Sequence, residues 1–526
     1  MLDSLLKPYI IRLFIVHYVV NVPLYSVPAN YEKNVIMSSF LYLQSLFLKK
    51  KVLFSLVILI YLLIPSTVFW VYPDSHLSIL FNSIIQVLFT LFIAIITLPS
   101  FEYRNNPFIV GSFIFFIYLG LAPIITYNKI NIISTSWQQW LIEEGINNRY
   151  LIKSQILLNI WGVTILLLGF ILSTFFRSIH TSILGYLSKK YFFFTVLSLF
   201  LLASQIYFAI NGQFALGGFS ENAIENGISP VLAILFPCFF LLPFLSGYYI
   251  KIKAKFLFVW YFILLLQLPW LLLMNKRSLI IGIYLFIFNY YSFETLKITW
   301  KKILSGSLLC FFIILAFNAF QSLRLYEFNT IINNQDYELL FNIFTDIDTS
   351  VLEEANDIYT AKRFFATHLP VARFCYIYET FDIHLLNGEG VMNAFKVATP
   401  GNFFFNKENI LVNEPLYTKR FGSLMDFDDV GDTIILQGLI DFGYIGIALY
   451  ICAFLGLIYF AYKIIRFANN YFVLLLFFIQ IIMLSMNLYE ETFGDVFVFI
   501  RFVISISIFS YITSFLSSLS FKFLHL

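Results

Sequence analysis

Long apolar stretches recur along the whole chain of 526 residues, and they constrain its fold more than any other feature. A helix needs about 20 predominantly apolar residues to cross a hydrocarbon layer about 30 Å thick. The stretches are continuous rather than alternating, which favours helices over a membrane barrel. Charged residues are only 12% of the chain, whereas soluble domains carry about 25%. The sequence therefore predicts an all-α polytopic membrane protein.

About twelve membrane-spanning helices are expected from the number of such stretches. Their approximate boundaries are 52–72, 77–98, 107–126, 152–176, 191–211, 228–249, 256–274, 279–294, 303–320, 433–462, 471–488 and 494–519. Arg12 and His17 interrupt the apolar segment 9–27, and Pro23 ends its helical part. An interfacial helix is preferred there over a further span.

The spans divide the chain into regions of different character. They are a cytoplasmic or interfacial N-terminal segment at 1–51, a transmembrane bundle of about nine spans at 52–320, a large extracytoplasmic loop at 321–432, and about three C-terminal spans at 433–526. Within the loop, Pro370 interrupts the stretch 353–385, which predicts two short amphipathic helices lying against the membrane.

Lysine and arginine residues in the short loops predict the orientation. Lys49, Lys50 and Lys51 precede the first span, and Lys251 and Lys253 follow the sixth, so both groups fall on one side of the membrane. Short cytoplasmic loops are enriched in these residues. Both termini are therefore expected in the cytoplasm, and the long loop is expected on the opposite side.

The adjacent cations Lys276 and Arg277 depart from this rule. They lie in the short turn between the spans 256–274 and 279–294, on the side where positive charge is expected to be rare. Basic groups at a membrane surface can bind a phosphate or diphosphate, and a guanidinium can do so with two parallel hydrogen bonds. The alternative is a snorkelling pair that caps a helix end.

The long loop carries further candidates for binding and catalysis. Arg363 and Arg373 lie near His368 and can converge with it on a site at the mouth of the bundle. An imidazole that titrates near neutrality can deprotonate a sugar hydroxyl, and Glu379 is an alternative base. Ion pairing within the acidic loop explains most of its other basic groups. Further candidates with weaker support are Arg324, Arg420, His384, Asp382 and Glu389, and the aromatic residues Trp137, Trp140, Tyr376 and Tyr378 as stacking surfaces for sugars.

The last predicted span contains a buried charge, Arg501. The carboxylates Glu490, Glu491 and Asp495 precede it in the outer turn. A charge inside the membrane is a functional candidate by default, and a structural ion pair with one of these carboxylates is the alternative.

Other functional classes receive no support from the sequence. The net charge of +3 is too small and too scattered to predict nucleic-acid binding. The four cysteines have no spacing that predicts a disulfide framework or a metal site. Phosphate-cradling, dinucleotide-binding and zinc-hydrolase motifs are absent from the sequence. Neither a metal nor a cofactor is therefore expected.

Three features together resemble the bacterial O-antigen polymerase and ligase superfamily, and in particular its Wzy-type polymerases. The stretch NKRSLIIGIYLF is similar to the family's outward turn with a basic residue, and Arg277 is the matching arginine. One long extracytoplasmic loop occupies the C-terminal half. The loop ends in GDTIILQGLIDFGYIGIALYICAFLG, similar to the family's entry into the next span, with Phe442 and Gly443 followed by Gly446.

The resemblance implies a GT-C-like bundle in the bacterial inner membrane that polymerises undecaprenyl-diphosphate-linked oligosaccharides, as both donor and acceptor, at the periplasmic face without a metal. A chain-length regulator is a possible partner. Arginines would stabilise the leaving diphosphate, and His368 or Glu379 would activate the acceptor hydroxyl. The residues assigned to the diphosphate are Arg277, Arg363 and Arg373, followed by Lys276, Arg324 and Arg420.

Two alternatives remain open. An O-antigen ligase would share the loop and its arginines, but the family's histidine near the end of the loop is missing, since none occurs between His384 and His525. A flippase or secondary transporter would have a similar number of spans. It would be expected to line them with charges, and it would not need a long outer loop.

Overall fold

A computed structural model describes most of the predicted spans and parts of the loops between them. The described residues are 59–71, 76–98, 100–127, 148–211, 213–215, 218–219, 230–274, 276–291, 367–399, 410–421, 433–468, 470–487 and 492–523. The chain divides into two compact units, Met1–Val57 and Ile58–Leu526, and all described residues belong to the second. The predicted interfacial segment 9–27, the span 303–320, and Arg324 and Arg363 lie outside the described residues.

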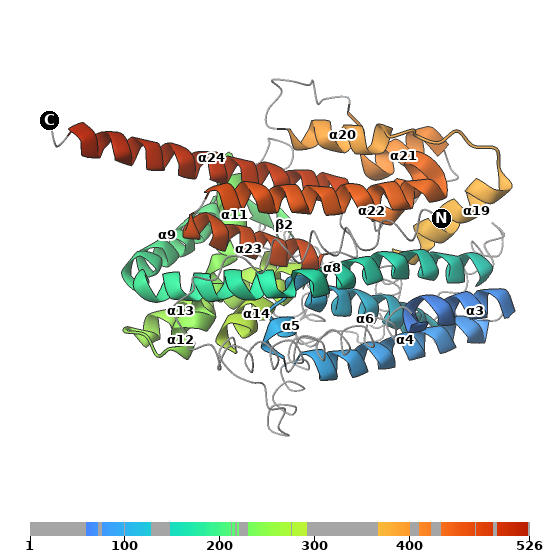
Figure 1. Cartoon of the computed structure of the whole chain (residues 1–526), viewed down its shortest axis with the longest axis horizontal. Coiled ribbons are helices and arrows are strands. Elements are labelled where there is room, and N and C mark those ends of the chain that lie inside the picture. Colours follow the sequence, from blue (N-terminus) through green and yellow to red (C-terminus); the bar gives the residue numbers. More distant parts are fainter. Residues whose placement is uncertain are drawn as a thin grey trace, which may run out of the picture. The chain divides into compact units, whose positions relative to one another are not determined.

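The described residues form helices almost throughout (Figure 1). In chain order the helices are η1 (Leu59–Leu63), α3 (Ile64–Val71), α4 (His76–Thr97), α5 (Phe101–Arg104), α6 (Pro107–Tyr127), α8 (Asn148–Lys189), α9 (Tyr191–Ile210), α11 (Pro230–Phe239), α12 (Leu241–Lys251), α13 (Leu257–Met274), α14 (Lys276–Tyr290), α19 (His368–Thr380), α20 (Glu389–Ala398), α21 (Asn413–Phe421), α22 (Ile434–Ala468), α23 (Tyr471–Met486) and α24 (Phe493–Phe523). One antiparallel pair, β1 (Phe214–Ala215) and β2 (Gly218–Phe219), places Phe214 opposite Phe219.

Four helices within the described ranges are long and apolar enough to cross a membrane. They cover Arg149–Lys189, Tyr191–Ile210, Ile434–Ile465 and Phe493–Ile512. Shorter apolar helices occupy the other predicted spans that the structure describes, including α4, α6, α13 and α23. The predicted helical membrane protein is thus confirmed, and the count of about twelve spans stays a prediction.

Several helices differ from the predicted spans in ways that have local causes. Helix α8 does not end near residue 176 but continues through Arg177 to Lys189, so the whole helix has 42 residues. The predicted span 228–249 is divided into α11 and α12, with Pro243 in the first turn of α12, four residues after the end of α11 at Phe239. A proline removes one backbone hydrogen bond and crowds the preceding turn, which favours such a break.

Helix α19 differs from the expected pair of helices in the loop. Pro370 lies in its first turn, where a helix tolerates proline because the missing N–H has no partner there in any case. The residues 368–375 and Ile377 are buried, and α19 packs against α8 and α22. It is therefore part of the protein interior rather than an amphipathic helix on the surface.

Helix α22 contains a sharp break at Phe442 and Gly443, whose backbone angles are not helical. Gly443 has φ of +63° and ψ of −151°, a region that is open essentially only to glycine. The two halves of α22 approach each other so closely that a Cβ atom on Gly446 would collide with the carbonyl oxygen of Gly438. The expected continuous span 433–462 is therefore two helical segments.

Contacts between residues near the helix ends divide these ends into two groups, as expected for spans that alternate in direction. Near the ends predicted to face the cytoplasm, the Tyr249 hydroxyl donates to the carbonyl oxygen of Leu187 at 2.9 Å, and Arg104 Nη2 donates to that of Tyr291 at 2.9 Å. Near the ends predicted to face outward, Tyr150 of α8 contacts Tyr376 of α19, and the Lys153 ammonium lies 4.6 Å from the centre of the Tyr444 ring of α22. Glu379, one of the candidate bases, lies at this second group of ends.

Candidate functional site

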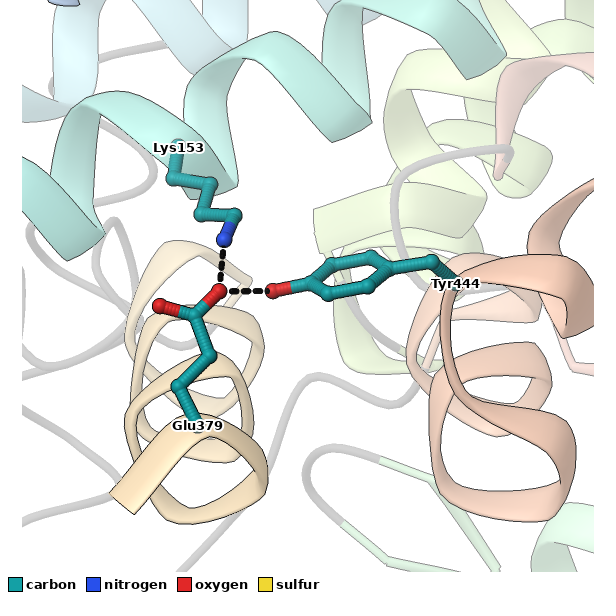
Figure 2. Close-up of polar contacts among 3 residues, drawn as sticks. All are labelled: Lys153, Glu379 and Tyr444. Carbon is teal, nitrogen blue, oxygen red and sulfur yellow. Dashed lines mark hydrogen bonds and ion pairs between the residues drawn. The ribbon is translucent and has the colours of Figure 1, made fainter.

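Three polar side chains from three separate segments meet at the predicted outer ends of the helices (Figure 2). Lys153 of α8 forms an ion pair with Oε1 of Glu379 on α19. The hydroxyl of Tyr444, on α22, donates to the same oxygen at 2.7 Å. The second carboxylate oxygen of Glu379 points away from both partners (Figure 2). We call these three residues the carboxylate site.

The local fold explains why these side chains meet. Lys153 lies in the second turn of α8, at the start of its apolar stretch, and Glu379 is the penultimate residue of α19. Tyr444 directly follows the break in α22, so the break sets the direction in which its side chain leaves the helix. Gly443 allows this arrangement because a Cβ there would lie 2.9 Å from the hydroxyl oxygen of Tyr378.

The electrostatics of the carboxylate site keep Glu379 ionised. Partial burial acts to raise the pKa of Glu379, but hydrogen bonds from Lys153 and Tyr444 outweigh it and hold the pKa below its ordinary value. The Lys153 ammonium also lies 4.6 Å from the centre of the Tyr444 ring, which is a cation–π contact. The side chains of Lys153 and Glu379 are 21% and 30% exposed, so a ligand can reach both.

Four tyrosine rings, that of Tyr444 among them, lie at the carboxylate site in two contacting pairs. Tyr150 and Tyr376 make an edge-to-face contact with ring centres 5.5 Å apart, and Tyr378 and Tyr444 do the same at 5.5 Å. All four rings are half-buried. The sequence-based expectation named Tyr376 and Tyr378 as stacking surfaces, and the structure places both beside Glu379, whereas Trp137 and Trp140 lie outside the described residues.

His368 occupies a different environment from Glu379. It is 3% exposed, its Nδ1 lies 3.4 Å from the hydroxyl of Ser154, and its Nε2 lies 3.2 Å from the carbonyl oxygen of Leu119. Burial lowers its pKa to about 4, so it is neutral at physiological pH. Glu379 lies eleven positions after His368 along α19, which is about 16 Å of helix. The two candidate bases do not share a site.

The residues predicted to bind diphosphate are not brought together by the described part of the structure. Arg373 is 2% exposed and lies in the middle of α19, about 120° or more around the helix from both His368 and Glu379. Arg420 is exposed in the last turn of α21. Lys276 and Arg277 are the first two residues of α14, so the helix begins within the short turn that was expected to hold them.

Asp441 is a buried carboxylate that sequence reasoning missed. It lies one residue before the break in α22 and is 1% exposed. Its two oxygens accept hydrogen bonds from the backbone N–H groups of Gly390 and Val391, each at 3.2 Å, and from the hydroxyl of Tyr450. Asp441 therefore caps the N-terminus of α20, where a negative charge is favourable.

Arg501 holds the other end of the same short helix. Its Nη1 donates to the carbonyl oxygen of Ala398, the last residue of α20, at 2.8 Å. Asp495, one of its expected partners, instead accepts hydrogen bonds from the backbone and hydroxyl of Thr492 at 3.0 and 2.8 Å. Arg501 thus stabilises the C-terminal end of a helix, where a positive charge is favourable.

Two of the missed residues had a signal in the sequence. Asp441 is the only charged residue in the apolar stretch from Ile434 to Tyr462, and Lys153 is a lone cation at the start of a span. Rare charges of this kind are functional or structural candidates. Tyr444 had no such signal among the 33 tyrosines of the chain.

The part of the chain that the structure describes contains no group of three or more histidine, cysteine, aspartate or glutamate side chains arranged to hold a metal ion. Comparison of the chain with protein-family models, with curated proteins and with solved structures found no match.

Proposed function

We propose that this chain is a metal-independent glycosyltransferase that polymerises undecaprenyl-diphosphate-linked oligosaccharide repeat units into O-antigen or a related surface polysaccharide. It would act at the periplasmic face of the bacterial inner membrane, with both termini in the cytoplasm. The carboxylate site carries this proposal. A reachable carboxylate and ammonium, flanked by tyrosine rings, lie where segments predicted to face outward meet.

Glu379 is the better candidate for the general base. Its Oε2 atom, which points away from Lys153 and Tyr444, is placed to accept the proton of an acceptor sugar hydroxyl. The hydroxyl oxygen then attacks the anomeric carbon of the donor. The bond from that carbon to the diphosphate oxygen breaks, and undecaprenyl diphosphate leaves with the electron pair. His368 is less suited because it is buried and already contacts Ser154 and the Leu119 carbonyl.

Lys153 gives the site a way to couple donor binding to base strength. In the structure its ammonium is paired with Glu379, which lowers the pKa of the carboxyl and weakens it as a base. A diphosphate is a stronger attractor for the ammonium because it carries more negative charge. When Lys153 turns to the diphosphate, the pKa of Glu379 rises, and the carboxylate becomes a better proton acceptor.

The remaining parts of the substrate are assigned by chemistry. The four tyrosines at the carboxylate site offer apolar ring faces and hydroxyl groups, which suits sugar rings. Lys276, Arg277 and Arg363 stay the candidates for further diphosphate contacts, with Arg324 and Arg420 after them. Arg373 is a less direct candidate, since it is buried on another side of α19.

The test is a lipopolysaccharide gel from the source strain with the gene deleted and then restored as wild type or variant. Deletion should collapse the ladder to core plus a single repeat unit, and wild type should restore it. Glu379→Gln should fail to restore the ladder despite normal expression. Asp382→Asn is the comparison, because Asp382 is the weaker candidate three residues further along; it is exposed and outside the carboxylate site, so this variant should restore the ladder fully.

Donor binding by purified protein separates the two charged residues of the site. Lys153→Met should weaken binding of the lipid diphosphate, whereas Glu379→Gln should leave it unchanged or strengthen it by freeing the ammonium. A normal ladder from Glu379→Gln would remove the carboxylate from the mechanism. Core without any repeat unit in the deletion strain would point to a ligase or a flippase instead.

A lipid-linked oligosaccharide flippase or transporter is the second candidate, because one observation favours it. A broken helix is a common feature of secondary transporters, and a buried carboxylate within a span is typical of their ion and proton pathways. Here the break at Phe442 and Gly443 adjoins Asp441. Accumulation of lipid-linked repeat units in the cytoplasmic leaflet of the deletion strain would support transport, and accumulation in the outer leaflet would support polymerisation.

A further inference from the structure

Uncharged polar side chains gather inside the bundle between η1, α4 and α8. They are Asn82, Ser83 and Gln86 of α4 with Gln155 and Asn159 of α8, and each is at most 3% exposed. We call these five residues the amide cluster. None of its members belongs to the carboxylate site, and what is inferred from it does not rest on the proposed function.

Helical spacing explains why the cluster forms. Asn82 and Gln86 are four residues apart on α4, and Gln155 and Asn159 are four residues apart on α8, so each pair lies on one helix face. The two faces meet at the Gln86 amide. Its Oε1 accepts hydrogen bonds from Gln155 Nε2 at 3.2 Å and from Asn159 Nδ2 at 3.1 Å.

Backbone carbonyl groups satisfy part of the cluster. Gln86 Nε2 donates to the carbonyl oxygen of Phe116 at 3.1 Å, and Asn159 Nδ2 also donates to that of Tyr61 at 3.0 Å. Tyr61 lies in the π-helical turn η1, and its hydroxyl contacts Thr90 at 2.5 Å. These contacts fix the orientation of the amide groups and make the cluster a rigid site.

Several polar atoms of the cluster have no hydrogen-bond partner among the described residues. They are Oδ1 and Nδ2 of Asn82, Oγ of Ser83, Oε1 of Gln155 and Oδ1 of Asn159. Buried polar atoms are nearly always hydrogen-bonded, and several unsatisfied atoms together indicate a bound partner. The amide nitrogens of Gln155 and Asn159 both donate to Gln86 Oε1, so the unsatisfied oxygens of these two amides lie close to each other.

The chemistry of these atoms identifies the partner. The unsatisfied oxygens accept hydrogen bonds, so the partner must donate them, and the Asn82 amide nitrogen requires an acceptor as well. A cation would bring an uncompensated charge into an apolar bundle, because the cluster is neutral. Water donates and accepts, and it occupies polar sites that offer two to four hydrogen bonds. We propose that the amide cluster is an internal binding site for water.

The proposed water site adjoins the start of α19. Ser154, which contacts His368, is the chain neighbour of Gln155. His368 also contacts the carbonyl group of Leu119, whose chain neighbour is Gly120. Gly120 packs so closely on α4 that a Cβ there would lie 3.2 Å from the Ser83 carbonyl oxygen. Water in the cluster therefore lies beside the contacts that hold the buried imidazole.

Radiolytic hydroxyl-radical footprinting of the intact protein in detergent tests the proposal, because radicals formed from bound water label buried side chains. Tyr61 is 1% exposed and bonded to the cluster through its carbonyl group. Its matched control is Tyr249, which is fully buried, stacks on Trp260 and is bonded to the Leu187 carbonyl. We expect Tyr61 to be labelled at least fivefold faster than Tyr249. Equally slow labelling of the two tyrosines would overturn the proposal.

A variant pair links the label to the cluster. In Gln155→Leu with Asn159→Leu, the two unsatisfied oxygens are removed at similar side-chain volume, and labelling of Tyr61 should fall to the level of Tyr249. Thr164→Val on the same helix is the control, because the Thr164 hydroxyl is bonded within α8 to the Ile160 carbonyl. Unchanged labelling in a folded double variant would place the water elsewhere. If the double variant does not fold, the wild-type comparison still decides.

Discussion

Replacing Gly443 by alanine tests the break in α22, on which the position of Tyr444 depends. The native angles, φ of +63° and ψ of −151°, cost a residue with a Cβ about 1–3 kcal/mol. The new Cβ would also lie 2.9 Å from the hydroxyl oxygen and 3.0 Å from Cζ of Tyr378. Overpacking of this kind costs about 1–3 kcal/mol. We expect the two terms together to lower the free energy of unfolding by about 3 kcal/mol or more, roughly a hundredfold in the equilibrium constant.

The assay is equilibrium unfolding in mixed micelles with an increasing fraction of denaturing detergent, followed by tryptophan fluorescence. Gly456→Ala is the matched control, because Gly456 lies in the regular part of α22 and a Cβ there meets nothing within 4 Å. Alanine is the better helix former by about 1 kcal/mol, so this control should be unchanged or slightly more stable.

A double variant separates backbone strain from crowding. Tyr378→Ala removes the crowded side chain but not the strain, so its combination with Gly443→Ala should recover roughly half of the loss in a double-mutant cycle. If Gly443→Ala were as stable as Gly456→Ala, α22 would be a continuous helix, and the reasoning that places Tyr444 beside Glu379 would be refuted.

Other residues allow predictions by the same unfolding measurement. Asp441→Asn should cost about 2–3 kcal/mol, since an amide offers one acceptor oxygen where the carboxylate uses two; a loss below about 0.5 kcal/mol would contradict the cap. Arg501→Met should cost about 1–2 kcal/mol by releasing the carbonyl at the end of α20, and an unchanged midpoint would count against that contact. The native pKa of Glu379 lies below its ordinary value of 4.5, so its ionised form stabilises the fold fully above about pH 4.5, and this stabilisation is lost as pH falls through the native pKa. The difference in unfolding free energy between wild type and Glu379→Gln should therefore shrink only in that range. His368 is neutral in the native state, with a pKa of about 4 against 6.5 when unfolded, so wild type should lose stability as pH falls from 6.5 to 4. His368→Gln should lack that component, and identical pH profiles would show that the imidazole is not buried.

The helices were predictable where hydropathy alone determines them. The predicted spans 77–98 and 107–126 agree within a residue or two with α4, His76–Thr97, and α6, Pro107–Tyr127. Hydropathy did not reveal the break in α22, because Phe442 and Gly443 lie inside an apolar run and change its mean hydropathy little. It also ended α8 too early, because a helix leaving the apolar layer keeps its backbone hydrogen bonds whatever its side chains are.

The carboxylate site was only partly predictable, because its partners are distant in sequence. Glu379 was a candidate base, but it is 226 residues from Lys153 and 65 residues from Tyr444. Such pairs depend on how α19 packs against α8 and α22, which no local pattern encodes. His368 could be recognised as a titratable group, but whether it is buried depends on the same packing.

The length of α8 has a mechanical consequence. An unbroken helix of 42 residues is about 63 Å long, which is twice the hydrocarbon thickness of a bilayer. If a helix of this length tilts as one rod by about 5° around its midpoint, each end is displaced by about 3 Å in opposite directions. That displacement is as large as a hydrogen bond is long. A rigid tilt at the Lys189 end would therefore be large enough to move the Lys153 ammonium out of hydrogen-bond reach of Glu379.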